Sequence, residues 1–327
     1  MAGNSSQPFL TPRFNGYRLA WIVVFIIATI DICGTLATAH SIRFNNGVHN
    51  APWFGILIGV IVWINARTPH AAAHRRWDRH FRELGNTTRW MLLFAAFLTV
   101  TDVLTYLSVT VNAPLIDDQL IRFDRFLRFD WMRTYQWVHE HRPLWYVLEA
   151  AYESGLVQTI GIPVVIGMTG RRRDLTEFIA CIMLASVACL AIATLFPAAS
   201  AFLHFGIDHP NTSSTVSQFL PLRSGALRIF DLDHPQGLVS MPSFHTIVGV
   251  LFAYSLRHLR YLFPFSVVLN LVMIVSTPTQ GGHYLADLLG GLVVAAATII
   301  VVRVSTDILS RRKSQIHARL RHIDSIR

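Results

Sequence analysis

The sequence predicts an all-α fold, a polytopic membrane helix bundle with about eight transmembrane helices. Of its 327 residues, 52% are hydrophobic and only 14% are charged, whereas about 25% are charged in an ordinary soluble domain. A soluble protein of this length could also bury a large core, so composition alone does not decide the class. The distribution decides it, because apolar runs of about 20 residues, enough to cross a bilayer core, recur along the chain.

Eight apolar runs are the expected spans. They lie at about 17–39, 51–66, 90–111, 143–168, 175–197, 241–257, 261–278 and 284–303. The second is short enough to be tilted or re-entrant. The first follows Arg13 and Arg18 and is too long for the core of a signal peptide, so we expect an uncleaved span. The three cysteines lie inside these runs, without the spacing of a disulfide framework or a metal site.

Arginines predict the orientation of the bundle. Four clusters lie in the loop at 67–89, the turn at 171–173, the turn at 257–260 and the tail at 311–327. With the N-terminus inside, all four face the cytoplasm, as the positive-inside rule favours. The loops that then face outward lie at about 40–50, 112–142, 198–240 and 279–283. Because the net charge of +9 is placed this way, it indicates membrane topology and no nucleic-acid partner.

The outer loop at 112–142 has a helical pattern of its own. The arginines at 122, 125, 128 and 133 are offset by four aspartates: Asp117, Asp118, Asp124 and Asp130. Apolar residues recur at helical spacing, at Ile116, Leu120, Phe123, Leu127 and Trp131. This stripe predicts an amphipathic helix lying in the outer membrane interface. The alternative is a helix packed against the other outer loops.

Two short motifs carry the strongest chemical signal. The sixth expected span opens with MPSFH at 241–245, and the eighth opens with GGHYLAD at 281–287. Both lie at the outer face in this topology. The start of a helix offers free backbone N–H groups and the positive end of the helix dipole, and both attract phosphate.

His283 and Asp287 have the spacing of a nucleophile and its orienting acid. Four residues apart on a helix, they share one face, so the carboxylate can accept from one ring nitrogen and leave the other free to attack. His245 could then protonate the leaving oxygen as a general acid. The simpler interpretations are polar anchors at the interface and a structural His–Asp hydrogen bond. A metal site formed by these three side chains is a further alternative.

These residues resemble the type 2 phosphatidic acid phosphatase superfamily, the membrane lipid phosphatases and phosphotransferases. Its members share a Pro-Ser-x-His motif, which 242–245 matches, and a Ser-Arg-x5-His-x3-Asp motif, which 276–287 matches in spacing. The resemblance implies that His283 is the nucleophile, Asp287 its orienter and His245 the acid/base, with no metal or other cofactor. It covers six spans from about residue 90.

The resemblance also implies a division of the chain. Residues 1–89 would hold two additional N-terminal spans and a basic cytoplasmic loop. Residues 90–310 would form the six-span, phosphatase-like catalytic core, and 311–327 a basic cytoplasmic tail.

The chain departs from the family pattern at several positions. Thr277 stands where the usual phosphate-binding arginine would be, Phe244 replaces the common glycine, and the family's earlier basic motif is not intact. Together with Tyr284 after the histidine, these changes resemble the branch that includes inositol phosphorylceramide synthase. That branch implies transfer of phosphate-linked headgroups between lipids.

Another group must then neutralise the phosphate, and the outer loop before His245 supplies candidates. Arg223 is the first choice, because a guanidinium binds phosphate in a bidentate manner and the adjacent Ser-Gly would let it turn inward. Arg228 is the second choice, and Ser243 is a further donor. The simpler interpretation of each arginine is a solvated loop residue.

The same loop holds other polar residues that could bind a metal or a headgroup. Their simpler interpretation is that they are ordinary exposed residues: His204, Asp208, His209, Asp231, Asp233 and His234.

Acidic residues within the fourth expected span are a separate candidate site. Glu149 and Glu153 lie one helical turn apart on one face. Charges inside a span usually face a cavity or a partner. With Tyr284 they could line a headgroup pocket, and ion pairs with arginines such as Arg223 explain them equally well.

The expected function is that of a membrane-embedded, metal-independent enzyme with a lipid phosphate or polyprenyl-type phosphate as substrate. A phosphohistidine would form at the outer face of the inner (plasma) membrane, toward the periplasm, the exterior or a lumen. Water as the acceptor makes the enzyme a phosphatase, and a sugar or inositol hydroxyl makes it a transferase. The alternative from another class is a non-enzymatic lipid-binding or flipping protein. Broken spans in inverted repeats would favour it, but the sequence shows no such symmetry.

Overall fold

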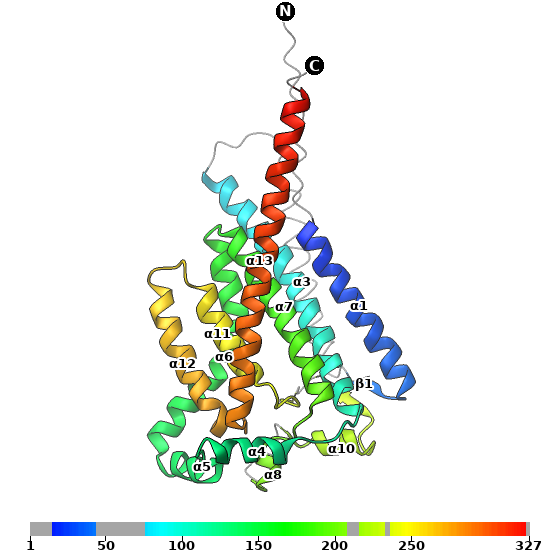
Figure 1. Cartoon of the computed structure of the whole chain (residues 1–327), viewed down its shortest axis with the longest axis vertical. Helices are drawn as coiled ribbons and strands as arrows, with labels where there is room; N and C mark the ends of the chain where they lie inside the picture. Colours follow the sequence, from blue (N-terminus) through cyan, green and yellow to red (C-terminus); the bar gives the residue numbers. More distant parts are fainter. Residues whose placement is uncertain (1–14, 44–75, 208–215, 233–235, 325–327) are drawn as a thin grey trace, which may run out of the picture.

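The computed structural model describes residues 15–43, 76–207, 216–232 and 236–324. A bundle of helices runs along the molecule, with short helices gathered across one end (Figure 1). The bundle helices are α1 (Asn15–Ala37), α3 (Arg76–Thr110), α6 (Arg142–Met168), α7 (Arg172–Leu195), α11 (Phe244–Ser255), α12 (Leu262–Gln280) and α13 (Leu285–Asp324). The short helices are α4 (Asp117–Phe126), α5 (Trp131–Glu140), α8 (Ala201–His204) and α10 (Phe219–Arg223). The all-α prediction is confirmed.

Five helices are long and apolar enough to cross a membrane. Their spans are Gly16–Ala37, Arg82–Thr110, Arg172–Leu195, Leu262–Gln280 and Leu285–Leu309. At 27 residues, α6 also has the length of a span, whereas α11 is a shorter apolar helix. Seven of the eight expected apolar runs therefore coincide with helices, and the run at 51–66 lies outside the described residues. The chain is an integral membrane protein.

The outward faces of the bundle are apolar, as a lipid environment requires. Leu36 on α1, Val157 on α6, Val268 on α12 and Val293 on α13 are all more than half exposed. In water, leaving such surface exposed costs about 25 cal/mol per Å² relative to burying it. Hydrocarbon chains remove that cost, so these faces are lipid-facing.

The bundle core holds α11, the helix that opens with the 241–245 motif, in place. Phe94 of α3 meets Phe178 of α7 edge to face, with ring centroids 5.9 Å apart, and Phe252 of α11 packs against the same Phe178 at 6.3 Å. All three rings are almost completely buried. Interlocked aromatic rings of this kind favour one fixed arrangement, so α11 has a defined position against α7.

Ion pairs join the described arginine clusters at one end of the bundle. Arg172 makes two hydrogen bonds of 2.8 Å to Glu83 of α3. Arg173 pairs with Asp307 of α13 at 3.8 Å. Figure 1 shows that α4, α5, α8 and α10 lie at the opposite end of the bundle.

Two helices extend beyond the expected apolar runs. Helix α3 starts at Arg76, and α13 continues to Asp324. Their polar ends contain good helix formers such as arginine.

The prediction of one amphipathic helix in the outer loop is wrong in detail. The stripe from Ile116 to Trp131 is divided between α4 and α5, because Arg128 adopts a left-handed conformation (φ 58°) and Asp130 begins the second helix by accepting from Arg133 N at 3.0 Å. Leu120 and Trp131 are buried, whereas Phe123 is 42% exposed. Both helices pack against other parts of this end, as the alternative interpretation expected.

A short parallel ladder, absent from the sequence prediction, ties the segment after α1 to the loop before α11. Strand β1 (Ser41–Arg43) pairs with β2 (Ile229–Asp231). The Tyr106 hydroxyl of α3 donates to the carbonyl oxygen of Asp231 at 2.9 Å. The ladder and this hydrogen bond thus anchor the loop that carries Arg223 and Arg228 to the segment after α1 and to α3.

Candidate active site

The two motifs meet where α11 and α13 begin. Ser243 is the N-cap of α11, and its hydroxyl oxygen accepts from the backbone N–H of Thr246 at 3.3 Å. Its own N–H donates to the carbonyl oxygen of Asp287 at 3.0 Å. The helices also approach closely, since a Cβ on Gly291 would lie 2.7 Å from the Ser243 carbonyl oxygen. The expected proximity of the two motifs is therefore present.

His283 lies just before α13, with its ring held at one nitrogen. Nδ1 is 3.1 Å from the carbonyl oxygen of Ser240 and 3.4 Å from Oδ2 of Asp287. That same Oδ2 also accepts from the Ser240 hydroxyl at 2.8 Å and from the Tyr284 N–H at 3.0 Å. Both His283 and Asp287 are buried, with 4% and 0% exposure. The two side chains thus meet although His283 itself precedes the helix.

These contacts define which ring nitrogen of His283 carries the proton. A backbone carbonyl oxygen can only accept, so the Nδ1 beside Ser240 must be the donor. In the neutral ring the other nitrogen, Nε2, then keeps its lone pair. A histidine fixed in this tautomer has one ring nitrogen whose lone pair is free to react.

His245 faces the same region from α11. Its ring centroid is 6.5 Å from that of His283, and its ring stacks on Tyr152 of α6 at 4.0 Å. Among the described residues, none forms a hydrogen bond with the His245 ring nitrogens. The ring is therefore oriented by stacking while its nitrogens stay available to a substrate.

Glycine is needed where the backbone passes this histidine pair. A Cβ on Gly281 would lie 2.7 Å from the Tyr152 hydroxyl and 2.9 Å from Cδ2 of His283. Gly282 has a φ of +64°, which favours glycine, and a Cβ there would also collide with Ser200. These two glycines let the segment before His283 run close against α6 and against Ser200, just before α8.

Two aspartates of α4 accept hydrogen bonds from residues at the start of α13. Asp124 accepts from the backbone N–H groups of Leu285 at 2.9 Å and Ala286 at 3.1 Å. Asp117 accepts from the Tyr284 hydroxyl at 2.8 Å and, with both oxygens, from Ala199 N. Burial raises the pKa of both carboxyl groups, and the hydrogen bonds that they accept lower it in part. A negative charge beside free N–H groups at a helix start is stabilising.

Two further contacts fix the main chain of the histidine segment. The indole N–H of Trp131 donates to the carbonyl oxygen of His283 at 3.1 Å. The Ser200 hydroxyl donates to the Gly282 carbonyl oxygen at 2.9 Å. Contacts from α4, α5 and the segment before α8 therefore surround the backbone on which His283 is mounted, which pre-organises its ring.

The candidate phosphate ligands are placed at this end but not all at the histidine pair. Arg223 donates to the carbonyl oxygen of Ala113 at 2.6 Å and lies over the Phe219 ring, while its buried Nη1 has no partner in the described part of the chain. Burial lowers the pKa of this guanidinium, and the charge of Asp117 raises it in part. Arg228 is exposed. In the described part, no hydrogen bond or ion pair links either arginine to His245 or His283.

The position of the missing family arginine is occupied by a neutral, internally bonded side chain. Thr277 is fully buried, and its hydroxyl donates to the carbonyl oxygen of Ile274 within α12. Ser243 is also buried, and it uses its oxygen as the helix cap described above. Its hydroxyl hydrogen is still available to donate to a phosphoryl oxygen.

The candidate headgroup residues are not brought together. Glu153 is exposed on the face of α6 that carries Val157, and Glu149 is half-buried. Tyr284 is fully buried on the other side of the histidine segment. It lines a cavity of about 310 Å³ with Asp124, Trp131 and two arginines, Arg125 and Arg128. Within the described residues, neither glutamate pairs with Arg223.

Among the described residues, no group of three or more His, Cys, Asp or Glu side chains is placed to hold a metal ion. Four loop candidates, Asp208, His209, Asp233 and His234, lie outside those residues. His204 ends α8, and Asp231 ends β2.

Sequence reasoning missed several residues of this site. The sequence pattern indicates only that Asp117 and Asp124 offset nearby arginines, and their tertiary contacts alone give them a role. Tyr152 lies between the two singled-out glutamates, in a helix without a motif. Ser240 acts through its backbone carbonyl, which no residue type reveals. Its place just before the 241–245 motif was the one available signal.

Comparisons with known proteins agree with this geometry. A family model of the PAP2 superfamily matches residues 118–301, which is more than half of the 327-residue chain and includes both motifs. Neither a curated protein nor a solved structure matches the chain. Members of this superfamily generally hydrolyse or transfer phosphoric esters, so a phosphatase-like or phosphotransferase function is supported. The chain belongs to the PAP2 superfamily.

Proposed function

We propose that the protein is a metal-independent lipid phosphate phosphatase or phosphotransferase that works through a phosphohistidine on His283. The observation that carries this proposal is the Nδ1 contact with the Ser240 carbonyl oxygen at 3.1 Å, next to Asp287. It leaves Nε2 as the nucleophile and places a carboxylate where the ring becomes positively charged during attack.

The reaction has two balanced steps. Nε2 of His283 attacks phosphorus, the ester or diphosphate P–O bond breaks, and protonated His245 gives its proton to the leaving oxygen. His245, now neutral, then takes a proton from water or an alcohol, whose oxygen attacks phosphorus and releases His283. The two ring centroids are 6.5 Å apart, close enough for both rings to contact the same phosphoryl group. The pair thus acts as nucleophile and as acid then base.

Charge on the phosphoryl oxygens needs donors that Thr277 cannot supply. Arg223 is our first candidate, because its buried Nη1 has no partner in the described residues. It also feels the charge of Asp117, which accepts a hydrogen bond from the Tyr284 hydroxyl. The Ser243 hydroxyl and the start of α11 add neutral donors, and exposed Arg228 is the weaker candidate. Donors placed where charge develops give most to such a reaction.

The acceptor distinguishes a phosphatase from a transferase. Thr277, Phe244 and Tyr284 favour the branch that includes inositol phosphorylceramide synthase, in which an alcohol accepts the group. The cavity of about 310 Å³ beside Tyr284 offers aromatic and charged groups for a polyhydroxylated acceptor or headgroup. Its wall includes Trp131, which holds the His283 carbonyl oxygen. We expect the substrate to be a lipid phosphate or a polyprenyl-type phosphate.

A panel of lipid phosphates and diphosphates tests the proposal. Purified protein would be given each lipid with and without inositol or sugar acceptors, and with and without a chelator. Free phosphate and new lipid products would both be followed. Turnover that the chelator does not change, and that His283→Ala abolishes, supports the enzyme. Lipid binding or transbilayer movement without any product supports the flipping alternative instead.

The site is proposed to face outward from the inner (plasma) membrane, toward the periplasm, the exterior or a lumen. This follows from the arginine clusters at the opposite end. In a protein whose native cysteines are replaced by serine, Ala226→Cys in the outer loop should react with an impermeant thiol reagent in intact cells. Tyr261→Cys in the α11–α12 turn, which is 84% exposed, should not. The reverse labelling would place the site in the cytoplasm.

A further inference from the structure

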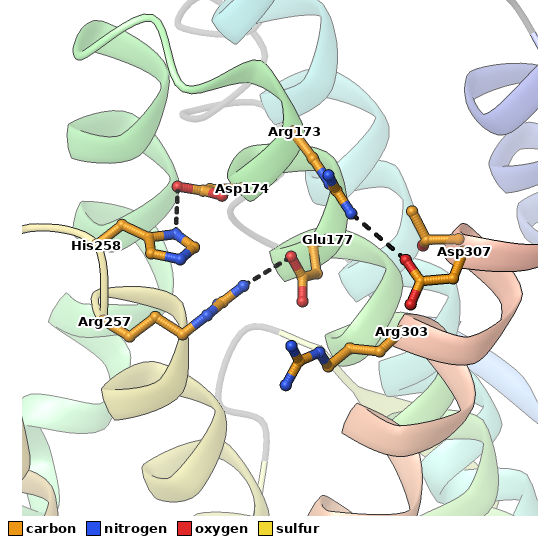
Figure 2. A pocket seen from close by; sticks show the side chains of 8 residues that line it. Arg173, Asp174, Glu177, Arg257, His258, Arg303 and Asp307 are labelled. Atoms are coloured by element: carbon orange, nitrogen blue, oxygen red, sulfur yellow. Dashed lines mark hydrogen bonds and ion pairs between the residues drawn. The ribbon is translucent and has the colours of Figure 1, made fainter. Parts of the chain in front are cut away.

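A second, strongly charged cavity lies at the end of the bundle opposite the histidines. Its volume is about 260 Å³, and it lies between α7, the segment after α11 and α13 (Figure 2). It is lined by Arg173, Asp174, Glu177, Arg257, His258, Arg303, Thr306 and Asp307. None of these residues takes part in the proposed reaction.

Each carboxylate of this cavity already has a cationic partner. Glu177 pairs with Arg257 at 2.9 Å and also accepts from the Tyr254 hydroxyl. Asp307 pairs with Arg173 at 3.8 Å. In addition, Asp174 accepts from Nδ1 of His258 at 3.1 Å and is approached by Arg171 at 3.6 Å. The acidic side chains are therefore compensated without Arg303.

Arg303 is the cation left over. In Figure 2 its guanidinium points into the cavity toward Glu177 and Arg257, with no interaction drawn to either. In the described part of the chain it has no hydrogen bond or ion pair. Two more guanidinium groups, from Arg173 and Arg257, line the same cavity. Arg257 and Arg173 are already paired with Glu177 and Asp307, so an anion that enters the cavity would meet the planar donors of Arg303 first, in surroundings with two further positive charges.

The surroundings of Arg303 indicate where such an anion would come from. Ile300, Val304 and Ile308 flank it on α13 and are 61%, 51% and 48% exposed. They are part of the lipid-facing surface, so an acyl chain can lie along α13 while its phosphate reaches Arg303. Basic pockets between membrane helices on the cytoplasmic side commonly bind anionic lipid headgroups.

We propose that this cavity binds the phosphate of an anionic glycerophospholipid from the leaflet opposite the active site. The lipid would complete the ion-pair cluster by adding a negative charge for Arg303. It would also join the ends of α7, α11 and α13, two of which carry the catalytic histidine motifs at their other ends. The proposal is independent of the reaction, because its test measures binding and not turnover.

The test is native mass spectrometry of the full-length, purified protein titrated with phosphatidylglycerol or, for comparison, zwitterionic phosphatidylcholine. Phosphatidylglycerol is a phosphodiester, so it tests anion binding without offering a terminal phosphate. Wild-type protein should retain one phosphatidylglycerol in preference to phosphatidylcholine. Arg303→Gln should weaken that binding about tenfold or more, as expected for loss of a charge-assisted contact. Arg303→Lys should be intermediate, because it keeps the charge and loses the planar donors.

Two matched controls make the outcome decisive. Arg260→Gln removes the same charge from the same end, at an exposed residue outside the cavity. It should change binding less than twofold, as should His283→Ala in the active site. Equal weakening by Arg260→Gln and Arg303→Gln would mean nonspecific attraction, and loss in His283→Ala would place the lipid at the active site. Displacement of the lipid by millimolar inorganic phosphate would mean a site for a free anion. Each of these three results overturns the proposal.

Unfolding temperatures measured without added lipid should match across the variants. This comparison separates a defect in lipid binding from misfolding.

Discussion

The carbonyl oxygen of Ser240 lies 3.1 Å from Nδ1 of His283, closer than the 3.4 Å to the Asp287 carboxylate that the sequence motif predicts as the partner. The His283 ring is therefore oriented by a backbone carbonyl as well as by the Asp287 carboxylate. Asp287 is connected more broadly, because its Oδ2 also holds the Ser240 hydroxyl and the Tyr284 N–H. It supports the shape of the whole segment as well as the charge on the ring.

Replacing the Asp287 charge tests this division of roles. Asp287→Asn should lower kcat by roughly 10- to 10³-fold, because the carbonyl of Ser240 still holds the correct tautomer while the stabilising charge is lost. This is less than the ~10⁴-fold loss that a wrong tautomer causes in serine proteases. Ser240→Ala keeps the carbonyl and removes one hydrogen bond to Asp287, so its loss should be about tenfold or less. Unchanged turnover in Asp287→Asn would contradict the role of this carboxylate.

Asp124 should be needed for a stable histidine segment although it never touches substrate. Asp124→Ala leaves the N–H groups of Leu285 and Ala286 without their acceptor, at about 1–3 kcal/mol for each buried group. We expect a lower unfolding temperature together with a lower kcat, measured by thermal unfolding in detergent and by turnover. The neighbouring, exposed Asp118→Ala is the matched control and should change neither. An Asp124→Ala protein as stable and active as wild type would show that α4 does not hold α13.

Gly281 should tolerate no side chain. Gly281→Ala places a methyl group 2.7 Å from the Tyr152 hydroxyl and 2.9 Å from the His283 ring, so the ring must shift. A displacement of this kind can cost ~10²-fold in rate, and we expect kcat to fall by about that factor. Gly161→Ala, with open space around its Cβ, serves as the control. Adding Tyr152→Phe should restore part of the rate, and no recovery would mean that the collision with His283 dominates.

Arg223 is the cation expected to replace the missing family arginine. Arg223→Ala should lower kcat by a factor on the order of 10² to 10³, as for loss of one oxyanion donor, and Arg228→Ala should be milder. Arg223→Lys should recover only part of the activity, because a point charge cannot form the bidentate contact. Steady-state kinetics with the best lipid of the panel gives the comparison. Wild-type turnover in both alanine variants would mean that other groups hold the phosphate.

Local patterns were sufficient to predict the bundle and the chemical motifs. Apolar runs predict helices because each satisfies its own backbone hydrogen bonds in lipid, and the ends of α6 and α12 fall within a few residues of the expected ones. The His-x3-Asp spacing predicted a contact that exists at 3.4 Å. In these cases the determining interactions lie within one turn or one segment.

The rest depends on contacts between distant segments. Asp124 and Leu285 are 161 residues apart, and nothing local to α4 shows that its carboxylate caps another helix. The break at Arg128 interrupts an apolar stripe that continues in sequence, so the pattern alone indicated one helix. Every residue has a backbone carbonyl oxygen, and the one of Ser240 gains its role only because packing places it beside His283.

The most direct measurement is the identity of the phosphorylated residue during turnover. Purified protein would be mixed with a radiolabelled lipid phosphate substrate, stopped in base, in which phosphohistidine survives, and digested for mass spectrometry. The mechanism predicts label on His283, none in His283→Ala, and loss of label when water or the alcohol acceptor is allowed to react. Rapid turnover with no label on His283, or with label on another residue, would contradict it.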